Sequence, residues 1–566
     1  MARHQADRKL PCACKMSVTE KGPADAAFLG TNTLRDMDIG ALTGAFQTYT
    51  KAGATALRAR LEAPTADPTE IQTRQTEIRA VRRCIRDPVV AKAIAEARET
   101  LRDTEADVTS MAEAATDKRH TEYYTQILWP PDSRLAWLNQ ISWVNEAMIF
   151  FRTLFLPGLA VLLPLFVIVA PLVIYHVVLK KPLSISEYFT MLQGSLKKAM
   201  PSVLGRPRFA GKGGAAEMGE QFVHMGVGAA MFIASIWNQI SAARSMRAVV
   251  TDMRSRATSV QRFTAATQEL AKQLGVTPTD ADTGRPWSTG TLAVFGDAWN
   301  DPARIRHLLS VAGRLDMLAA VAAQRRVCFP KRSTESLRIR DIYHPTITSE
   351  RRVFNTIELT PTKKRHVLLT GPNRGGKSTL LKSLGAAVLM NQTLGVVFAR
   401  RAEMPVFGNI ITALSPSDTL GEMSLFEAEI EFAKVVRGRI TDASAPVFLM
   451  MDEIFHGTNA HDGVEASQVF LDDLYGRQSA SAAPVFSIVS THYMDLPQRY
   501  GSISEEDTKH LTQNLCMDAS VDPADADRLI YTYALKSGVN KFSSVREILR
   551  ERGLLGEKTP VLASKE

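Results

Sequence analysis

The chain has 566 residues, which is too long for one ordinary domain and suggests three or four. Its hydrophobic content of 45% and charged content of 22% are ordinary for globular proteins, so they exclude wholesale disorder and a polytopic transporter. The net charge of +9 is compatible with nucleic acid or anionic lipid as a partner and selects neither.

Residues 1–33 are expected to be a disordered basic segment. They contain no apolar core of about 7 to 15 residues, so no secretory signal is expected. The five cysteines of the chain are odd in number and scattered, which argues against a disulfide framework and for a reducing compartment.

Residues 34–150 are expected to form the first half of a helical core. Apolar residues recur at helical spacing within 39–61 and again within 71–81. Pro64 and Pro68 mark the connection between these two helical runs.

Residues 151–241 contain two apolar stretches that predict membrane segments. Residues 153–179 carry no Asp, Glu, Lys or Arg and are long enough to cross about 30 Å of hydrocarbon as a helix. Three prolines interrupt this stretch, which a membrane helix tolerates better than a buried helix of a soluble protein, the alternative interpretation. Residues 222–240 also lack a full charge, and their glycine spacing suits helix contact in lipid.

Residues 242–326 are expected to return to the helical core and to form its second half, with helices near 241–274 and 302–326. Strand-like runs begin at Val327. We therefore predict an α/β domain over 327–552, with a mainly parallel sheet and flanking helices, and a tail over 553–566.

A glycine-rich loop lies between a short apolar strand and a helical run, which is the arrangement of a phosphate loop. Its glycines let successive backbone N–H groups face inward, and the following helix adds its positive N-terminus. Lys377 is expected to reach the β- and γ-phosphates of ATP, and the Ser378 hydroxyl to take one Mg²⁺ position. The predicted nucleotide-binding residues of the loop are Gly371, Pro372, Asn373, Arg374, Gly375, Gly376, Lys377, Ser378 and Thr379.

Two further apolar strands end in ionisable residues. One ends in Asp452 and Glu453, which are expected to hold Mg²⁺ and to activate the attacking water, respectively. The next is followed by His492, which is expected to sense the γ-phosphate. Because parallel strands end at one edge of a doubly wound sheet, Lys377, Glu453 and His492 form the predicted catalytic set.

The segments around these residues resemble the MutS family, the DNA mismatch-repair ATPases and their relatives. Residues 370–379 have the family's Thr-Gly-Pro-Asn-x-Gly-Gly-Lys-Ser-Thr form, although Arg374 stands where a methionine is usual. Residues 451–458, Met-Asp-Glu-Ile-Phe-His-Gly-Thr, are similar to its Walker B segment, and Thr-His-Tyr at 491–493 is similar to its switch histidine.

The resemblance implies an ABC-type ATPase head that binds ATP and Mg²⁺ and acts as a homodimer. Residues 423–429, Met-Ser-Leu-Phe-Glu-Ala-Glu, are similar to the family's signature segment, in which Ser424 would contact the γ-phosphate bound by a partner subunit. Tyr533 falls where the family stacks a ring against adenine, and residues 341–345 with Asn355 resemble the start of the same domain.

Upstream, residues 34–110 and the helix before the ATPase domain resemble the family's helical core with less specificity. We expect no counterpart in this sequence of the family's mismatch-recognition domain or of its DNA-gripping clamp. In the family, the clamp is inserted between two long helices, called lever helices. The apolar residues 151–241 occupy the place of the clamp in chain order, so the lever helices would end at a membrane.

The leading hypothesis is a membrane-attached switch in which two ATPase heads dimerise around ATP and hydrolysis moves the levers. The ATPase domain would lie in the cytosol. Two membrane crossings would place the basic segment 180–212 on the other side, although positive segments usually stay cytoplasmic. A re-entrant first segment, a single crossing or a translocated basic segment would each resolve this conflict.

Two alternatives remain at this stage. In the first, the basic segment 180–212 grips DNA phosphates, although such segments bind anionic lipid equally well. In the second, the chain is a scaffold that binds nucleotide without turnover. The complete set of Lys377, Ser378, Asp452, Glu453 and His492 speaks against a scaffold.

Overall fold

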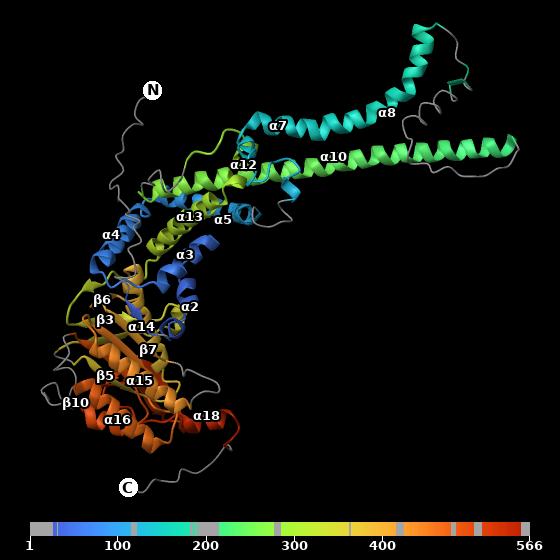
Figure 1. Ribbon diagram of the computed structural model, residues 1–566. Coiled ribbons are helices and arrows are strands. Elements are labelled where there is room, and N and C mark those ends of the chain that lie inside the picture. Colours follow the sequence, from blue (N-terminus) through green and yellow to red (C-terminus); the bar gives the residue numbers. More distant parts are fainter. Residues whose placement is uncertain are drawn as a thin grey trace, which may run out of the picture. The chain divides into compact units, whose positions relative to one another are not determined.

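The structure is a computed structural model (Figure 1), in which two compact units can be distinguished. It describes residues 27–30, 32–114, 122–180, 184, 187–188, 214–276, 285–361, 364–414, 424–476, 483–502 and 512–555. The larger unit draws on residues 1–99, 267–278 and 310–566, and the smaller unit on 100–266 and 279–309. These units do not coincide with the domain boundaries expected from the sequence, which stay predictions.

An eight-stranded sheet organises the C-terminal part of the larger unit. Its order is β1-β7-β8-β9-β5-β11-β10, and β12 pairs with β11. All pairs along this order are parallel, and only the β11–β12 pair is antiparallel. The strands are β1 (Phe28–Leu29), β5 (His366–Thr370), β7 (Asn409–Ala413), β8 (Val447–Met451), β9 (Val485–Ser490), β10 (Gly501–Ser502), β11 (Thr512–Asp522) and β12 (Asp525–Ser537). The predicted mainly parallel sheet is confirmed.

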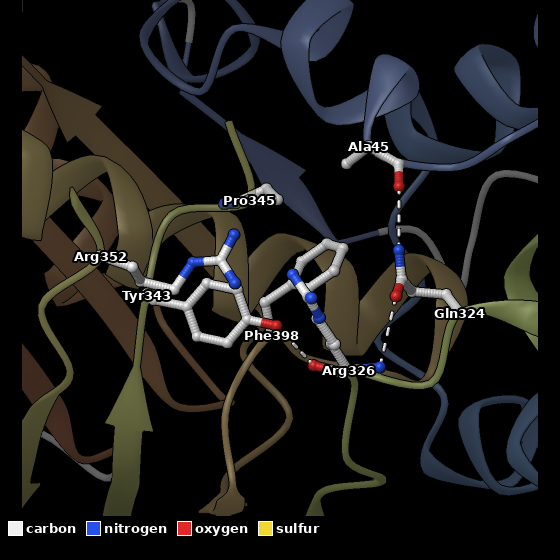
Figure 2. A pocket seen from close by; sticks show the side chains of 7 residues that line it. All are labelled: Ala45, Gln324, Arg326, Tyr343, Pro345, Arg352 and Phe398. Carbon is white, nitrogen blue, oxygen red and sulfur yellow. Dashed lines mark hydrogen bonds between the residues drawn. The ribbon is translucent and has the colours of Figure 1, made fainter. Parts of the chain in front are cut away.

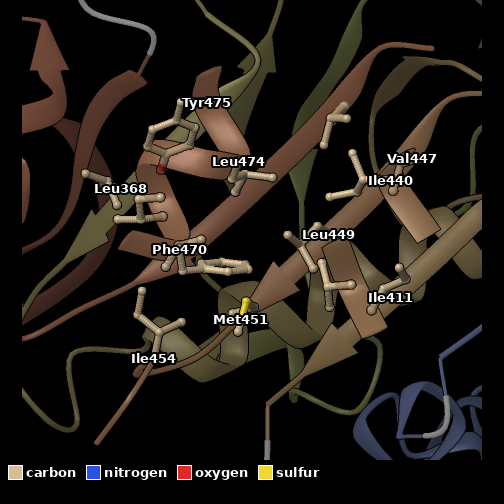
Figure 3. Close-up of a cluster of buried hydrophobic side chains, with 14 of the residues drawn as sticks. Leu368, Ile411, Ile440, Val447, Leu449, Met451, Ile454, Phe470, Leu474 and Tyr475 are labelled. Carbon is tan, nitrogen blue, oxygen red and sulfur yellow. The ribbon is translucent and has the colours of Figure 1, made fainter. Parts of the chain in front are cut away.

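Helices cover both faces of this sheet. They are α14 (Lys377–Leu394), α15 (Leu425–Thr441) and α16 (Ala460–Gly476). Ile440 of α15 and Leu474 of α16 share a buried apolar cluster with Leu449 of β8 (Figure 3). Gly385 of α14 packs on the other face, where an added Cβ would lie 2.8 Å from the Met450 side chain. Consecutive residues of β8 therefore serve opposite faces, as the two-residue period of a strand requires.

The first described residues belong to the edge of this sheet. Phe28 and Leu29 form β1 and pair in parallel with Asn409 and Ile410 of β7. Both residues belong to the segment 1–33, which is expected from the sequence to be disordered. The structure differs because their backbone groups find partners on a strand about 380 positions further along the chain.

Asp36, at the end of α1 (Thr33–Asp36), makes a second link to β7. It is 2% exposed, and its Oδ2 accepts hydrogen bonds from Thr412 Oγ1 at 2.7 Å and from Leu414 N at 3.0 Å. The N-terminal segment thus fixes the end of β7 as well as its edge.

A second, four-stranded sheet precedes the phosphate loop. Its order is β2-β6-β3-β4, with β3 antiparallel to both of its neighbours. The strands are β2 (Lys331–Arg332), β3 (Leu337–Ile342), β4 (Asn355–Leu359) and β6 (Arg401–Met404).

The helical part of the larger unit is held by a buried polar cluster, called here the Asp316 cluster. Asp316 is fully buried, and its carboxylate accepts hydrogen bonds from Arg98 Nε at 2.6 Å, from Tyr49 N and Thr50 N at 2.9 Å, and from Thr50 Oγ1 at 2.8 Å. Arg98 also donates to Gln47 O at 2.6 Å. The helices here are α2 (Ile39–Gly44), α3 (Lys51–Glu62), α4 (Pro68–Cys84), the beginning of α5 (Pro88–Ala114) and the later part of α13 (Pro302–Ala323).

Arg74 of α4 connects this helical part to the helix after the phosphate loop. Its Nη1 donates to Gln392 O at 2.9 Å and to Thr393 O at 2.8 Å. Both carbonyls lie in the last turn of α14, where a helix lacks its own donors and a cation is favourable. Burial lowers the pKa of Arg74, and the neighbouring Glu70 opposes that effect.

The smaller unit is helical and contains α7 (Ser142–Phe150), α8 (Leu156–Val173), most of α10 (Gly214–Gln273) and α12 (Thr291–Asn300). It also contains η2 (Ala136–Gln140) and two π-helical turns, η3 (Phe151–Phe155) and η4 (Ile174–Val178). Tyr124, Phe295 and Trp299 form its buried aromatic core, with ring centroids 5.0 to 6.4 Å apart.

Large apolar side chains are exposed along α7 to η4 and on α10. They include Trp143 at 72%, Leu162 at 63%, Phe166 at 69%, Ile233 at 66% and Trp237 at 65%. Across the described parts of the chain, no helix has the length and apolar character needed to cross a membrane. The crossings expected from the sequence are therefore not supported. The basic segment 180–212 lies almost wholly outside the described residues.

Candidate nucleotide site

The phosphate loop joins β5 to α14 through a tight turn. Gly371 and Gly376 have φ angles of +149° and +93°, and Arg374 has a φ of +68°. A Cβ added at Gly375 would lie 2.9 Å from Pro372 O. The loop needs glycine at 371, 375 and 376 because a side chain there would strain the backbone or fill the space enclosed by it.

Lys377, the first residue of α14, directs its ammonium group into this loop. It is 5% exposed, and its Nζ donates to Gly371 O at 2.9 Å and to Pro372 O at 3.4 Å. Burial lowers the pKa of Lys377, while the nearby Glu453 and Asp452 carboxylates oppose this. The loop amides and the lysine together form a cationic cradle of the kind that binds phosphate.

Ser378 and Asp452 meet although 74 positions separate them. Ser378 Oγ donates to Asp452 Oδ2 at 2.7 Å. A hydroxyl and a carboxylate are the hard oxygen ligands that Mg²⁺ prefers. The donor set therefore fits the Mg²⁺ expected from the sequence.

Glu453 and His492 pair at the same edge of the sheet. His492 Nε2 lies 2.8 Å from Glu453 Oε1 and 3.2 Å from Lys377 Nζ. The hydrogen bond to His492 lowers the pKa of Glu453, and burial opposes this. β5, β9 and β8 are adjacent in the sheet, and so the predicted catalytic residues come together as expected.

Ser490 is a site residue that sequence reasoning missed. Its buried hydroxyl donates to Asp452 Oδ1 and accepts from Glu453 N at 3.0 Å. It thereby touches both acids of the Walker B segment. The only signal in the sequence was a serine at the end of the strand that precedes His492.

Ser424 lies at the N-terminus of α15 and caps it. Its Oγ accepts from Glu427 N at 3.2 Å, and Glu427 Oε2 accepts from Ser424 N at 2.9 Å, forming a reciprocal capping box. The role expected for Ser424 toward a partner's nucleotide stays a prediction. The preceding Met423 lies outside the described residues.

The Tyr533 ring lies beside the phosphate loop. A Cβ added at Gly376 would come 3.2 Å from Tyr533 Cδ1. Asn355 holds the segment by donating to Tyr533 O at 3.0 Å and by accepting from Leu535 N at 2.7 Å. Tyr533 is 45% exposed and has a φ of +57°, so a large part of its surface is open to a ligand.

Arg374 forms an ion pair with Glu551 in α18 (Val545–Glu551). This contact raises the pKa of Arg374. Tyr531 donates to Glu547 of the same helix. No local pattern in the sequence indicated that α18 meets the phosphate loop.

A separate pocket of about 240 Å³ lies elsewhere in the larger unit (Figure 2). The Arg352 guanidinium lies 4.2 Å from the centre of the Tyr343 ring, and Tyr343 OH donates to Arg326 O at 2.7 Å. None of the predicted nucleotide-site residues lines it. Its lining residues are Ala45, Gln324, Arg326, Tyr343, Pro345, Arg352 and Phe398.

This site and sheet define a phosphate-loop ATPase domain, and comparison with known proteins places it more narrowly. Residues 367–550 match the MutS domain V family, which is an ABC-like ATPase domain. The predicted resemblance to the MutS family is confirmed for this region.

The relatives found by sequence are DNA mismatch repair proteins MutS. The protein of Thermus thermophilus is 33% identical over 211 residues, which cover 36% of this chain and 24% of the relative. That of Bacillus cereus is 29% identical over 218 residues, covering 37% and 23%. That of Thermus aquaticus is 32% identical over 198 residues, covering 34% and 23%. The chain spans about a quarter of the length of these relatives.

Proposed function

We propose that this chain hydrolyses ATP in a head-to-head homodimer with composite sites and uses the cycle to move its lever helices. The observation that carries the proposal is the meeting of Lys377, Ser378, Asp452, Glu453 and His492 at one edge of the sheet. The sequence similarity to MutS domain V over residues 367–550 supports the same conclusion.

The phosphate loop and Lys377 would bind the triphosphate. Ser378 and Asp452 would hold Mg²⁺, which supplies charge neutralisation on the phosphate oxygens when bound. Ser490 keeps Asp452 oriented for this role, because its hydroxyl donates to the second carboxylate oxygen.

Glu453 would act as the general base toward the attacking water. Its lowered pKa keeps the carboxylate ionised, which is the form that can accept a hydrogen bond from the water. His492 holds the carboxylate through Oε1 and approaches Lys377, so it lies between the base and the phosphate cradle. The backbone of Glu453 has a φ of +54°, a conformation that costs energy and is common at active sites.

Two further residues are proposed to contact nucleotide, Ser424 at the start of α15 and Tyr533. Ser424, at the exposed start of α15, would contact the γ-phosphate held by the other subunit, and Tyr533 would stack on adenine. The position of Tyr533 next to Gly376 supports the second role.

A Glu453→Gln variant tests the chemistry. Loss of a general base lowers kcat by about 10²- to 10⁴-fold. We expect that loss with ATP binding retained and with an ATP-dependent dimer that persists in sedimentation. Glu465→Gln, an exposed change on α16, is the matched control. Normal hydrolysis by Glu453→Gln would refute the mechanism.

We further propose that the exposed apolar helices of the smaller unit associate with a membrane while the ATPase domain works in the cytosol. The support is the run of exposed large side chains from Trp143 to Val177 and at Ile233 and Trp237. Monomeric soluble proteins rarely leave so many large apolar side chains together in water.

Flotation of the full chain with phosphatidylglycerol–phosphatidylcholine vesicles tests this proposal. Burial of a Leu or Phe side chain contributes about 1.5–3 kcal/mol, so a Leu162→Ser, Phe166→Ser double variant should lower partitioning at least about tenfold. Leu554→Ser, at an equally exposed residue of the larger unit, is the control. Wild-type protein that stays unbound would refute membrane association.

DNA binding is the second candidate, because the relatives are named DNA mismatch repair proteins. Binding through phosphates weakens steeply with salt. A gel-shift titration with duplex DNA across salt concentrations would reveal it, and no shift at low salt would remove this candidate.

A further inference from the structure

The loop that carries the catalytic carboxylate packs directly against the start of α15. We call residues 452–458 the catalytic loop. A Cβ added at Gly457 would lie 2.8 Å from Phe426 N, so no side chain fits between the loop and the helix. The rings of Phe426 and Phe455 make an edge contact with centroids 6.3 Å apart. The loop and the first turns of α15 are therefore one packed assembly.

Glu429, one turn into α15, binds the backbone of this loop. Its Oε1 accepts from His456 N at 3.3 Å, and its Oε2 accepts from Gly457 N at 3.1 Å. His456 Nδ1 lies 2.9 Å from Glu429 Oε1 and 2.8 Å from Glu453 O. A continuous set of polar contacts thus runs from Glu429 to the backbone of the predicted base.

The catalytic loop needs such support because its backbone is strained. Glu453 and Phe455 have φ angles of +54° and +55°, which non-glycine residues rarely adopt. Strained conformations persist only where neighbouring contacts hold them. Tyr493 OH supplies one by donating to Phe455 O at 2.9 Å, and Glu429 supplies the contacts on the α15 side.

We propose that Glu429 is a positioning residue that sets Glu453 of its own subunit according to the position of α15. This inference rests on the proposed dimeric ATPase. The start of α15 carries Ser424, which faces the partner's nucleotide in that dimer. Nucleotide bound by one subunit would therefore orient the base of the other, and ATP hydrolysis at the two sites would be coupled.

The first test compares Glu429→Ala and Glu429→Gln with Glu431→Ala in the full chain. Glu431 lies on the same helix, is exposed and pairs with Lys434. Because small misplacements of catalytic groups cost up to about 10²-fold, Glu429→Ala should lower kcat by about 10- to 100-fold. The Kd for a fluorescent ATP analogue should change less than about twofold, since no contact to the phosphate loop is lost. Glu429→Gln should lie in between, and Glu431→Ala should match wild type.

The second test uses mixed dimers to separate action on the chain's own site from action on the partner's. Pairing a Glu429→Ala chain with a Glu453→Gln chain leaves one competent base, on the Glu429→Ala chain. We expect turnover about tenfold or more below that of a wild-type chain paired with Glu453→Gln. Placing both changes on one chain beside a wild-type chain should restore turnover to that reference. Reference-level turnover in the first mixed dimer together with reduced turnover in the second would overturn the proposal.

Failure of this inference and of the proposed function give different results. If the wild-type chain does not turn over ATP, the proposed function is wrong. If it does, and both Glu429 variants keep kcat within about twofold of wild type, only the role of Glu429 is wrong. Thermal melting checks the fold of each variant, and Glu429→Gln carries the test if Glu429→Ala does not fold.

Discussion

The nucleotide site and the Asp316 cluster are both polar assemblies built from residues distant in the chain, but they differ in exposure and strain. The Glu453 and His492 side chains are each 39% exposed, and Glu453 has a positive φ. The Asp316 side chain is fully buried and that of Arg98 is 8% exposed. The first assembly is open to a ligand and strained, whereas the second is closed and has its carboxylate fully hydrogen-bonded.

This difference indicates what each assembly contributes. A buried ion pair is costly to break, because removing one partner leaves an uncompensated charge in a dry interior. An exposed pair contributes little to stability, but its groups remain available for chemistry. Changes in the first assembly should therefore alter catalysis, and changes in the second should alter folding.

The largest effect is expected for Asp316→Ala. Breaking this buried pair strands the Arg98 guanidinium and two backbone donors, so the free energy of unfolding should fall by about 3–5 kcal/mol. Chemical denaturation followed by circular dichroism measures it. Glu62→Ala, which removes the exposed pair with Arg58, is the control and should change stability by under about 0.5 kcal/mol. Equal losses in the free energy of unfolding for the two variants would contradict the inference that the buried Asp316 cluster contributes more to stability than an exposed ion pair does.

Ser490→Ala should affect catalysis at least as clearly as stability. It removes the donor to Asp452 and the acceptor for Glu453 N, and leaving a buried donor unsatisfied costs about 1–3 kcal/mol. Because both acids lose their orientation, kcat should fall about 10- to 100-fold with ATP still bound. Steady-state kinetics and nucleotide titration check this. A loss of stability with unchanged kcat would mean that Ser490 contributes to folding and not to catalysis.

His366 tests whether burial, rather than location in the ATPase domain, decides that a polar residue contributes to stability and not to catalysis. It lies in β5 beside Ser487 and is fully buried, and burial lowers its pKa from 6.5 to about 3. Because the folded state resists protonation, stability is complete above pH 6.5 and is lost as pH falls toward 3. The slope is about 1.4 kcal/mol per pH unit for one proton. Unfolding free energies measured from pH 6.5 to 5 should fall more steeply in wild type than in His366→Gln, and the difference between the two slopes is the contribution of His366.

The smallest effect is expected for Arg374→Met. The ion pair with Glu551 is exposed on both sides, so its loss should change kcat/KM for ATP by less than about threefold. Glu551→Gln should give the same small change. A larger change in Arg374→Met alone would mean that the arginine contacts nucleotide rather than α18.

Local patterns in the sequence predicted the parts of the site that local chemistry dictates. Glycines between a strand and a helix indicated the phosphate loop, and apolar strands ending in Glu453 and His492 indicated the shared edge. The structure brings these residues together because β8, β9 and β5 are adjacent.

Contacts between distant side chains could not be predicted in this way. No periodicity reports that Ser490 meets Asp452, that Arg374 meets Glu551, or that Asp316 meets Arg98. The apolar stretches of the smaller unit were expected from the sequence to cross a bilayer, but among the described residues no helix is long and apolar enough to do so.

The pairing of β1 with β7 has a consequence for folding and for handling the protein. A fragment that begins at the ATPase domain would leave the backbone groups of β7 unpaired along one edge, and open edges promote self-association. In the full chain this edge closes only after Asn409 has been synthesised, about 380 positions after Phe28. Completion of the sheet is therefore a late, long-range event of the kind that slows folding.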